Sequence, residues 1–306
     1  MAREIPNNEN AELAEQKTVV VTGASGFIGI NLVKHLADRG HLVHAVSRSA
    51  PESWRYLDSR ATPHQWDMTD TKTSQLLANL SPDAIVHLAA GPSKAKTPEE
   101  RHQALEIDVL GAHTLIEAAE IASCRIVHAG SSFEAVASSH GAPFRAVSKS
   151  AAAAVVRQST VDAALLRIGR AYGPWEQPGR LLYRLLEAAG TEETVALTPD
   201  DATRSYVFVG DVCQAIEAVL QHPGAYELDI AGEHRLTARV VAETVEKVTG
   251  RKLRVEIGKY PIGAIDRFVP PQDLNRTREL IGWSPATSLE VGIALMDEWF
   301  SSQRRS

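Results

Sequence analysis

The chain has 306 residues, of which 44% are hydrophobic and 23% are charged, and its formal net charge is −6. This length and composition are typical of a globular α/β protein that buries a sizeable core. The negative charge argues against nucleic-acid binding, which needs a basic surface, and no apolar run approaches the roughly 18 residues of a membrane span.

The N-terminal segment and the cysteines give expectations about location. Residues 1–16, MAREIPNNENAELAEQ, are polar and lack the apolar core of a signal peptide, so we expect a flexible tail. The two cysteines, Cys124 and Cys213, lie far apart in apolar surroundings, which is typical of buried, reduced thiols. No CxxC or HxxxH spacing indicates a metal site. These features together predict a cytoplasmic protein that uses no metal ion.

Residues 17–48 organise the rest of the chain. The β-branched run 19–21 predicts a buried strand, apolar residues at helical spacing over 28–36 predict a helix, and the run 42–46 predicts a second strand. Three glycines at intervals of three residues separate the first strand from the helix: Gly23, Gly26 and Gly29. In such a βαβ unit, backbone N–H groups at the start of the helix can bind a pyrophosphate. The sequence therefore predicts a dinucleotide site.

The alternation of strands and helices continues beyond this unit. Strands are predicted at 84–90, 125–129 and 163–168, and helices at 100–122 and 145–159. This alternation predicts a Rossmann-type, doubly wound parallel sheet with right-handed crossovers over residues 17–169.

The second half of the chain has a different texture. From about residue 170, eight prolines divide it into shorter pieces. We expect 170–306 to form mainly a small C-terminal substrate-binding lobe, with segments near 205–232 returning to the Rossmann sheet. The amphipathic stretch 289–300 predicts a terminal helix.

A series of motifs follows the order of one known family. The motifs are TGASGFIG (22–29), HLAA (87–90), DVLGAHTLIEAA (108–119), GSSFEA (130–135), SK (148–149), RIGRAYGP (167–174), RSYVFVGDV (204–212), IGWSP (281–285) and SLEVGI (288–293). In this order they resemble the extended short-chain dehydrogenase/reductases, the NAD(P)-dependent nucleotide-sugar epimerase, dehydratase and reductase family. Asp108 stands where that family usually has asparagine. The resemblance implies a nicotinamide cofactor, a nucleotide-sugar substrate and a homodimer formed through the helices at 100–122 and 145–159.

The resemblance also implies which residues bind the cofactor. They are Gly23, Ser25, Gly26, Phe27, Ile28, Gly29, Asp67, Met68, Leu88, Ala89, Ala90, Gly130, Lys149 and Ile168. The second strand ends at Ser47 and Arg48, where an NAD-binding protein of this fold carries a carboxylate for the ribose. A hydroxyl followed by a guanidinium suits a 2′-phosphate, so we expect NADP(H) rather than NAD(H).

The catalytic motif departs from the family at one position. The family uses a serine or threonine, a tyrosine that transfers the proton, and a lysine four residues later that holds the ribose and lowers the tyrosine's pKa. Ser132 matches the serine, Lys149 matches the lysine, and Glu134 stands where related dehydratases carry a catalytic glutamate. Arg145 occupies the tyrosine position, and a permanently charged guanidinium cannot act as a general acid.

Three interpretations of this departure remain open. Arg145 can stabilise a developing alkoxide while water supplies the proton. Another residue can replace the tyrosine, and the candidates are Glu134, Tyr172, Tyr206 and a histidine such as His140. Alternatively, the protein has lost ordinary redox turnover and binds its ligand for another purpose.

Arginines are the candidates for substrate binding. Arg204 matches the family's arginine for the nucleotide diphosphate, and Arg170 adds a charge where the family usually has asparagine. Arg180 and Arg276 are further candidates. The leading prediction is an NADP(H)-dependent ketoreductase acting on a nucleotide-activated deoxy or keto sugar. One alternative is an epimerase or dehydratase that retains NAD(P) and uses Glu134 as base, and the other is a non-redox dinucleotide-binding protein.

Overall fold

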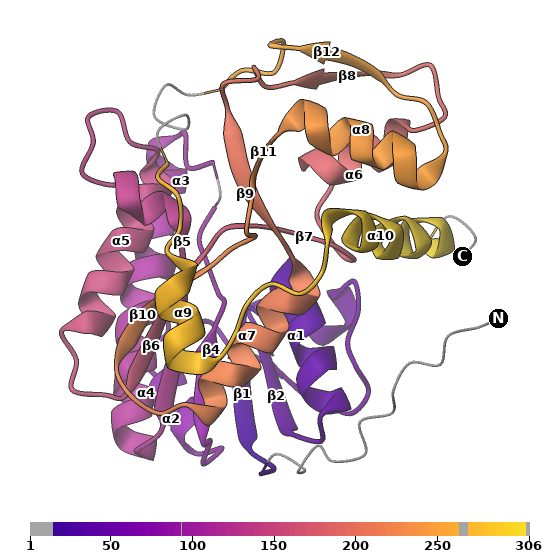
Figure 1. Cartoon of the computed structure of the whole chain (residues 1–306). Helices are drawn as coiled ribbons and strands as arrows, with labels where there is room; N and C mark the ends of the chain where they lie inside the picture. Colours follow the sequence, from indigo (N-terminus) through magenta and orange to yellow (C-terminus); the bar gives the residue numbers. More distant parts are fainter. Residues whose placement is uncertain (1–14, 93, 263–268, 304–306) are drawn as a thin grey trace.

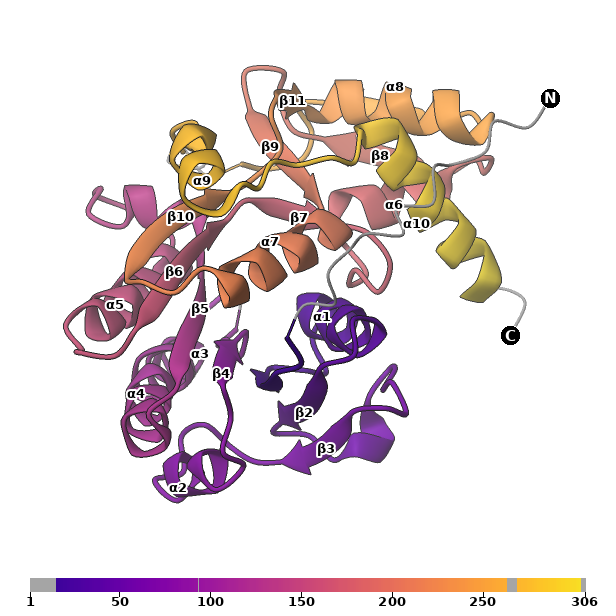
Figure 2. The same ribbon diagram turned by 60° about the horizontal axis from the view of Figure 1, so that its bottom comes forward.

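A parallel sheet of seven strands forms the centre of the molecule (Figures 1 and 2). The computed structural model describes residues 15–92, 94–262 and 269–303, so all but the last two residues of the expected N-terminal tail lie outside it. The strand order is β10-β6-β5-β4-β1-β2-β3. The strands are β1 (Thr18–Thr22), β2 (Leu42–Ser47), β3 (Thr62–Gln65), β4 (Ala84–His87), β5 (Arg125–Ser131), β6 (Ala163–Ile168) and β10 (Tyr226–Ile230). The predicted doubly wound parallel fold is confirmed, and the order reverses between β1 and β4, where such folds bind ligands.

Helices cover both faces of this sheet. One face is covered by α1 (Phe27–Asp38), α7 (Val209–Gln221) and α9 (Leu274–Ile281), and the other by α2 (Thr73–Ala78), α4 (Gly111–Ala122) and α5 (Phe144–Arg157). In β1, Val19 and Val21 belong to the core under α1, whereas Val20 belongs to the core under α4 and α5. All three valines are fully buried, which explains why the strand is a continuous apolar run instead of an alternating one.

The predicted helix over 100–122 contains a distortion. It consists of α3 (Pro98–Leu105), a π-helical turn (Glu106–Leu110) and α4. Thr97 begins α3 with a capping box in which its side chain accepts the Glu100 N–H. The π-helical turn carries Asp108, whose side chain is buried although it is charged. Such single wide turns are frequently found at functional sites.

A smaller lobe lies over the carboxyl edge of the sheet (Figure 1). It has a three-stranded sheet, a two-stranded sheet and three helices: β7 (Arg170–Tyr172), β9 (Thr203–Phe208), β11 (Arg235–Thr237), β8 (Thr194–Leu197), β12 (Arg254–Ile257), α6 (Leu181–Ala188), α8 (Ala238–Thr249) and α10 (Leu289–Gln303). None of the helices that the structure describes is long and apolar enough to cross a membrane.

Two elements within the segment 205–232 lie with the main sheet. The strand β10 pairs with β6, and α7 packs against α1. The strand β9, which precedes these two elements, pairs with β7 and β11 in the lobe. Tyr206 of β9 contacts Tyr172 of β7 at a ring distance of 6.5 Å, and both belong to the core of the lobe. Packing inside the lobe therefore holds β9 away from the main sheet.

Candidate active site

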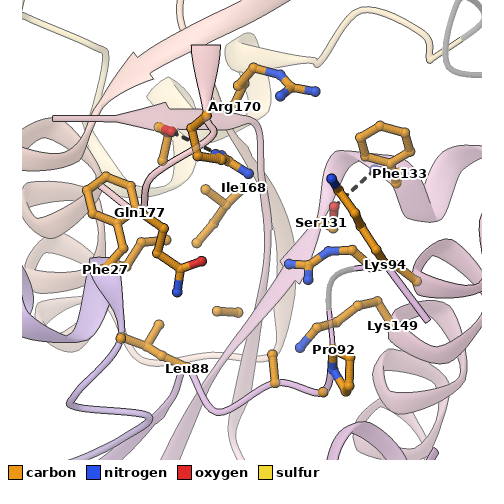
Figure 3. A pocket seen from close by; sticks show the side chains of 18 of the residues that line it. Phe27, Leu88, Pro92, Lys94, Ser131, Phe133, Lys149, Ile168, Arg170 and Gln177 are labelled. Carbon is orange, nitrogen blue, oxygen red and sulfur yellow. Dashed lines mark hydrogen bonds between the residues drawn. The ribbon is translucent and has the colours of Figure 1, made fainter. Parts of the chain in front are cut away.

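One large cavity lies where the carboxyl ends of the strands meet the lobe. Its volume is about 1430 Å³, larger than the roughly 300–1,000 Å³ of a pocket for one small ligand. Its wall contains all of the predicted cofactor residues and the substrate candidates Arg170, Arg180 and Arg204, together with Ser132, Arg145 and Lys149. Figure 3 shows opposite sides of the cavity, with Ser131, Lys149 and Pro92 on one side and Phe27 and Gln177 on the other. The cavity has room for a dinucleotide and a second ligand.

In the turn between β1 and α1, glycines let the backbone pass close to neighbouring backbone atoms and to a ligand. Gly23 has φ +69°, and a Cβ on it would lie 2.6 Å from the Ala89 backbone nitrogen. A Cβ on Gly29 would lie 2.3 Å from the Gly23 carbonyl oxygen. Gly26 precedes α1 and offers no side-chain cap to the first amides of the helix. These open donors and the side-chain-free turn fit the pyrophosphate of a dinucleotide.

The end of β2 carries hydroxyls and a guanidinium. Ser47 Oγ lies 2.7 Å from Ser25 Oγ and 3.3 Å from Ser49 Oγ. The next residue, Arg48, is exposed and lines the cavity. Asp67 lies farther along the wall, where its Oδ1 accepts hydrogen bonds from the N–H and the hydroxyl of Thr69, both at 2.9 Å. The strand end itself thus presents donors that suit an additional phosphate.

Glu134 has a structural contact that its motif did not reveal. It belongs to a 3-10 turn (Ser132–Val136) at the end of β5, and its Oε1 accepts the Ser131 N–H at 2.6 Å in a capping box. Burial raises the pKa of Glu134 to about 7. Ser131 and Ser132 line the cavity, but Glu134 is not part of its wall. The cap thus holds this carboxylate against β5, behind the part of the wall that Ser131 and Ser132 form.

Lys149 is held by a buried carboxylate. Its Nζ lies 3.3 Å from Asp108 Oδ1, and both side chains are about 3% exposed. Asp108 Oδ2 accepts the Ser148 hydroxyl at 2.7 Å, and Oδ1 accepts the Gly91 N–H at 3.0 Å. Burial raises the pKa of Asp108, but Lys149 and these two donors outweigh it and hold the pKa below its usual range.

The candidate replacements for tyrosine do not all reach the cavity. Tyr172 is buried in the core of the lobe, where its ring meets Tyr206 and Phe208, and it is not part of the wall. His140 is exposed and also lies outside the wall. Tyr206 does line the cavity, next to Arg170, its register partner on β7.

The cavity is strongly basic in a protein of net charge −6. Among the described residues, its wall has ten basic side chains and two acidic ones, Asp67 and Glu176. The basic residues are Arg48, Lys94, Lys96, Arg145, Lys149, Arg170, Arg180, Arg184, Arg204 and Arg235. The candidate Arg276 is exposed and is not among them. This excess of positive charge favours a ligand with several negative charges.

Two of the arginines that sequence reasoning missed are fixed by neutral partners. Arg235 donates from Nη2 to the Thr203 carbonyl and from Nη1 to the Val269 carbonyl, both at 3.0 Å. Arg184 donates to the Ala196 carbonyl at 2.6 Å and lies over the Tyr260 ring. These hydrogen bonds orient the guanidinium groups and leave their charges for a ligand. No local motif marks either residue, because both come from lobe segments that only the fold brings to the cavity.

The loop after β7 holds an acidic residue that the sequence reasoning also missed. Glu176 is buried in the wall, and its Oε1 accepts from Arg180 Nε at 3.2 Å. Burial raises the pKa of Glu176 to about 7. The preceding Trp175 has φ +68°, which is a strained conformation for a large side chain. Glu176 thus combines with Arg180 as a fixed pair and offsets part of the basic charge.

Comparison with known proteins gives a consistent result. The chain is 28% identical to a UDP-glucose 4-epimerase of Mycolicibacterium smegmatis, covering 93% of this chain and 98% of the relative. It is 27% identical to a dTDP-4-dehydro-6-deoxy-D-allose reductase of a Streptomyces species, covering 94% and 98%. A solved UDP-glucose 4-epimerase of Thermotoga maritima superposes with a TM-score of 0.81 at 21% identity, covering 94% of this chain and 99% of the other. The protein MoeE5, solved with UDP-glucuronic acid and NAD, superposes with a TM-score of 0.77 at 25% identity over 94% and 99%.

A family model covers most of the parallel sheet. The model of the NAD dependent epimerase/dehydratase family matches residues 19–230, from β1 to β10. This match spans the glycine turn, the end of β5, Lys149 and the strands that carry Arg170 and Arg204. The chain belongs to the NAD-dependent epimerase/dehydratase family.

Proposed function

We propose that this enzyme is an NADP(H)-dependent reductase that acts on a keto group of a nucleotide-linked sugar. One observation carries the proposal: a single cavity joins a glycine cradle, a strand end with Ser47 and Arg48 in place of a carboxylate, and a basic wall. The nicotinamide supplies the hydride when bound. The protein supplies orientation and charge.

The two ends of the cavity have different tasks in this proposal. Arg48 and Ser47 bind the 2′-phosphate of the cofactor, and the turn at Gly23 holds the pyrophosphate. On the lobe side, Arg204 and Arg235 bind the diphosphate of the substrate, since both line the cavity there. These contacts place the sugar between the lobe and the end of β5.

The reacting end of the cavity holds three further groups. Ser132 hydrogen-bonds the sugar oxygen, and the buried Lys149 lines the same cavity. Arg145 adds a positive charge that stabilises the negative charge developing on that oxygen. Arg170 adds a further charge at the lobe side, which suits a substrate with an acidic group on the sugar.

The experiment that tests the proposal measures cofactor binding first and hydride transfer to a sugar second. The purified enzyme is titrated with NADPH and NADH by fluorescence, and is then mixed with dTDP-4-dehydro-6-deoxyglucose, UDP-glucose or UDP-glucuronate. We expect tighter binding of NADPH and loss of its 340-nm absorbance only with the keto sugar. Equal binding of both cofactors, or no hydride transfer with any of these sugars, contradicts the proposal.

An epimerase that retains its cofactor is the second candidate. It is favoured by the similarity to UDP-glucose 4-epimerases in sequence and in fold. An epimerase would keep its dinucleotide through purification and convert UDP-glucose to UDP-galactose without net consumption of added NADPH. Tight binding of NADPH and of UDP without any sugar conversion would instead favour the non-redox alternative.

We also propose that two copies of the chain associate through α4 and α5. Leu110 and Ile121 are exposed about three helical turns apart, on the same side of the helix. Val147 is exposed on α5, which packs beside α4 (Figure 2). Sedimentation should give a dimer for the wild type and a monomer for Ile121→Arg, and a monomeric wild type contradicts the idea.

A further inference from the structure

We propose that Lys149 gives the proton to the sugar oxygen, and that Arg145 and Asp108 are positioning residues that set its charge. This inference rests on the proposed redox function. In the family pattern a lysine assists a tyrosine that stands four residues before it. Here the residue four positions before Lys149 is Arg145. The lysine is therefore the proton donor, and the residue four positions before it is the assisting charge.

The placement of Lys149 supports this assignment. The residue is 2% exposed, yet its side chain reaches the wall of the cavity that Ser132 and Arg145 share. Figure 3 shows its amino group pointing into the cavity, on the same side as Ser131. The other two lysines in the wall, Lys94 and Lys96, are exposed and solvated by water, whereas Lys149 is buried.

The charges around Lys149 act in opposite directions. Burial lowers the pKa of Lys149 below its usual value, and the positive charge of Arg145 lowers it further. The negative charge of Asp108, 3.3 Å away, raises it again, as Glu134 does to a smaller extent. A lysine with a lowered pKa is a better general acid near neutral pH than a free lysine, because its proton leaves more easily.

The other titratable groups that surround Lys149 do not compete for this role. His87 on β4 and His128 on β5 are fully buried, and burial lowers the pKa of His87 to about 3 and that of His128 well below its usual value. Both are therefore neutral at pH 7. Glu134 accepts the Ser131 N–H and is not part of the cavity wall.

The two unusual residues next to Lys149 make sense together. Arg145 stands in place of tyrosine and adds one positive charge, and Asp108 stands in place of asparagine and adds one negative charge. Asp108 is fixed by Ser148 and the Gly91 N–H, so it is an ionised partner that cannot turn away. Without it, two cations would lie at the buried end of the cavity with no counter-charge, which is costly.

The proton and electron balance is simple. The carbonyl carbon receives a hydride from the reduced nicotinamide, and the electron pair of the C=O bond moves to the oxygen. The N–H bond of the Lys149 ammonium breaks, and its proton forms the new O–H bond. Lys149 is left as a neutral amine and takes a proton from water through the open cavity. In the reverse direction the neutral amine accepts the hydroxyl proton.

The first test measures the charge of Lys149 directly and needs no substrate. Protein labelled with 13C at the lysine Cε is titrated by NMR, and Lys149→Arg identifies the Lys149 resonance. We expect that resonance to titrate below the bulk of the lysines. The midpoint of its titration should move to higher pH in Arg145→Gln and to lower pH in Asp108→Asn. A Lys149 that titrates with the bulk, or that does not respond to either change, overturns the proposal.

The second test separates proton transfer from cofactor binding. Lys149→Arg keeps the charge and the reach to Asp108 but cannot release a proton. We expect NADPH affinity within a few-fold of the wild type and a loss of about 10²–10⁴ in kcat with dTDP-4-dehydro-6-deoxyglucose. Lys252→Arg, on an exposed residue, is the matched control and should leave both unchanged. Retention of wild-type kcat in Lys149→Arg overturns the proposal.

Failure of the proposed function looks different from failure of this inference. A wild-type enzyme that transfers no hydride refutes the reductase, while the NMR titration still decides the charge of Lys149. An active wild type with an equally active Lys149→Arg variant refutes only the role of Lys149. In an active enzyme, kcat should fall at high pH as Lys149 loses its proton. The pH of this fall should rise in Arg145→Gln and drop in Asp108→Asn, as the NMR titration midpoint does.

Discussion

Replacement of Glu134 by glutamine tests whether this residue is a structural cap for the turn at Ser132 or a catalytic base. The carboxylate accepts the Ser131 N–H at 2.6 Å, and a Cβ on Gly130 would lie 2.1 Å from its Oε1, so the group is packed closely against β5. Glutamine keeps an oxygen for the same N–H but cannot ionise. We expect the variant to fold and to keep the turn at Ser132.

The stability of the variant relative to the wild type should depend on pH. Burial raises the pKa of Glu134 from its usual 4.5 to about 7 in the folded state. Between these values the folded state binds more protons than the unfolded state, so wild-type stability falls as pH rises. At about 1.4 kcal/mol per pH unit, the full loss is about 3 kcal/mol above pH 7 and vanishes below pH 4.5.

Urea unfolding at several pH values between 5 and 8 measures this difference. The glutamine variant should gain about 2.5 kcal/mol over the wild type between pH 5 and pH 8, because every other titrating group is common to both proteins. Glu120→Gln, on an exposed residue of α4, is the matched control and should show no such trend. A difference that stays constant with pH, or that favours the wild type as pH rises, refutes the reasoning. A loss of about 10²–10⁴ in kcat for Glu134→Gln, with stability unchanged, would instead assign the base role to Glu134.

Three further variants test the cavity wall. Arg48→Ala should weaken NADPH binding about tenfold or more, since a charge-assisted hydrogen bond contributes about 1.5–3 kcal/mol, and should leave NADH binding nearly unchanged; equal losses remove the case for NADP(H). Gly29→Ala should abolish dinucleotide binding by fluorescence, because its Cβ would meet a backbone oxygen at 2.3 Å. Gly40→Ala is the control: its φ of +83° makes the variant less stable, but its Cβ would meet nothing within 4 Å, so it should still bind the dinucleotide. Arg235→Gln should weaken the affinity for UDP about tenfold, measured by calorimetry, and leave NADPH affinity unchanged. UDP affinity equal to the wild type would place the diphosphate elsewhere.

The sequence predicts those features that depend on local order. The glycine turn, the strand over 19–21 and the strand end at Ser47 follow from neighbouring residues, and all line or support the cavity in the structure. The parallel sheet also follows, because regular alternation of strands and helices leaves few other arrangements.

Features that depend on distant contacts are not visible in the sequence. Arg184 and Arg235 reach the cavity only because the lobe folds over the sheet, and neither lies in a motif. The strand predicted over 84–90 ends at His87, because residues 88–90 leave the sheet and line the cavity. Glu134 matches a catalytic pattern in sequence, but its capping contact with Ser131 appears only in three dimensions.

The wide turn at Glu106–Leu110 makes the site depend on the number of residues in a helix. A π-helical turn holds one residue more than a regular turn, and each residue of an α-helix rotates the next by about 100°. Deleting one residue before Asp108 would let the helix close up and swing this carboxylate around the axis, away from the amine that it faces. A deletion of one residue there should thus separate the Asp108 carboxylate from the Lys149 amine, although both groups are still present. A scan of single substitutions would not reveal this effect.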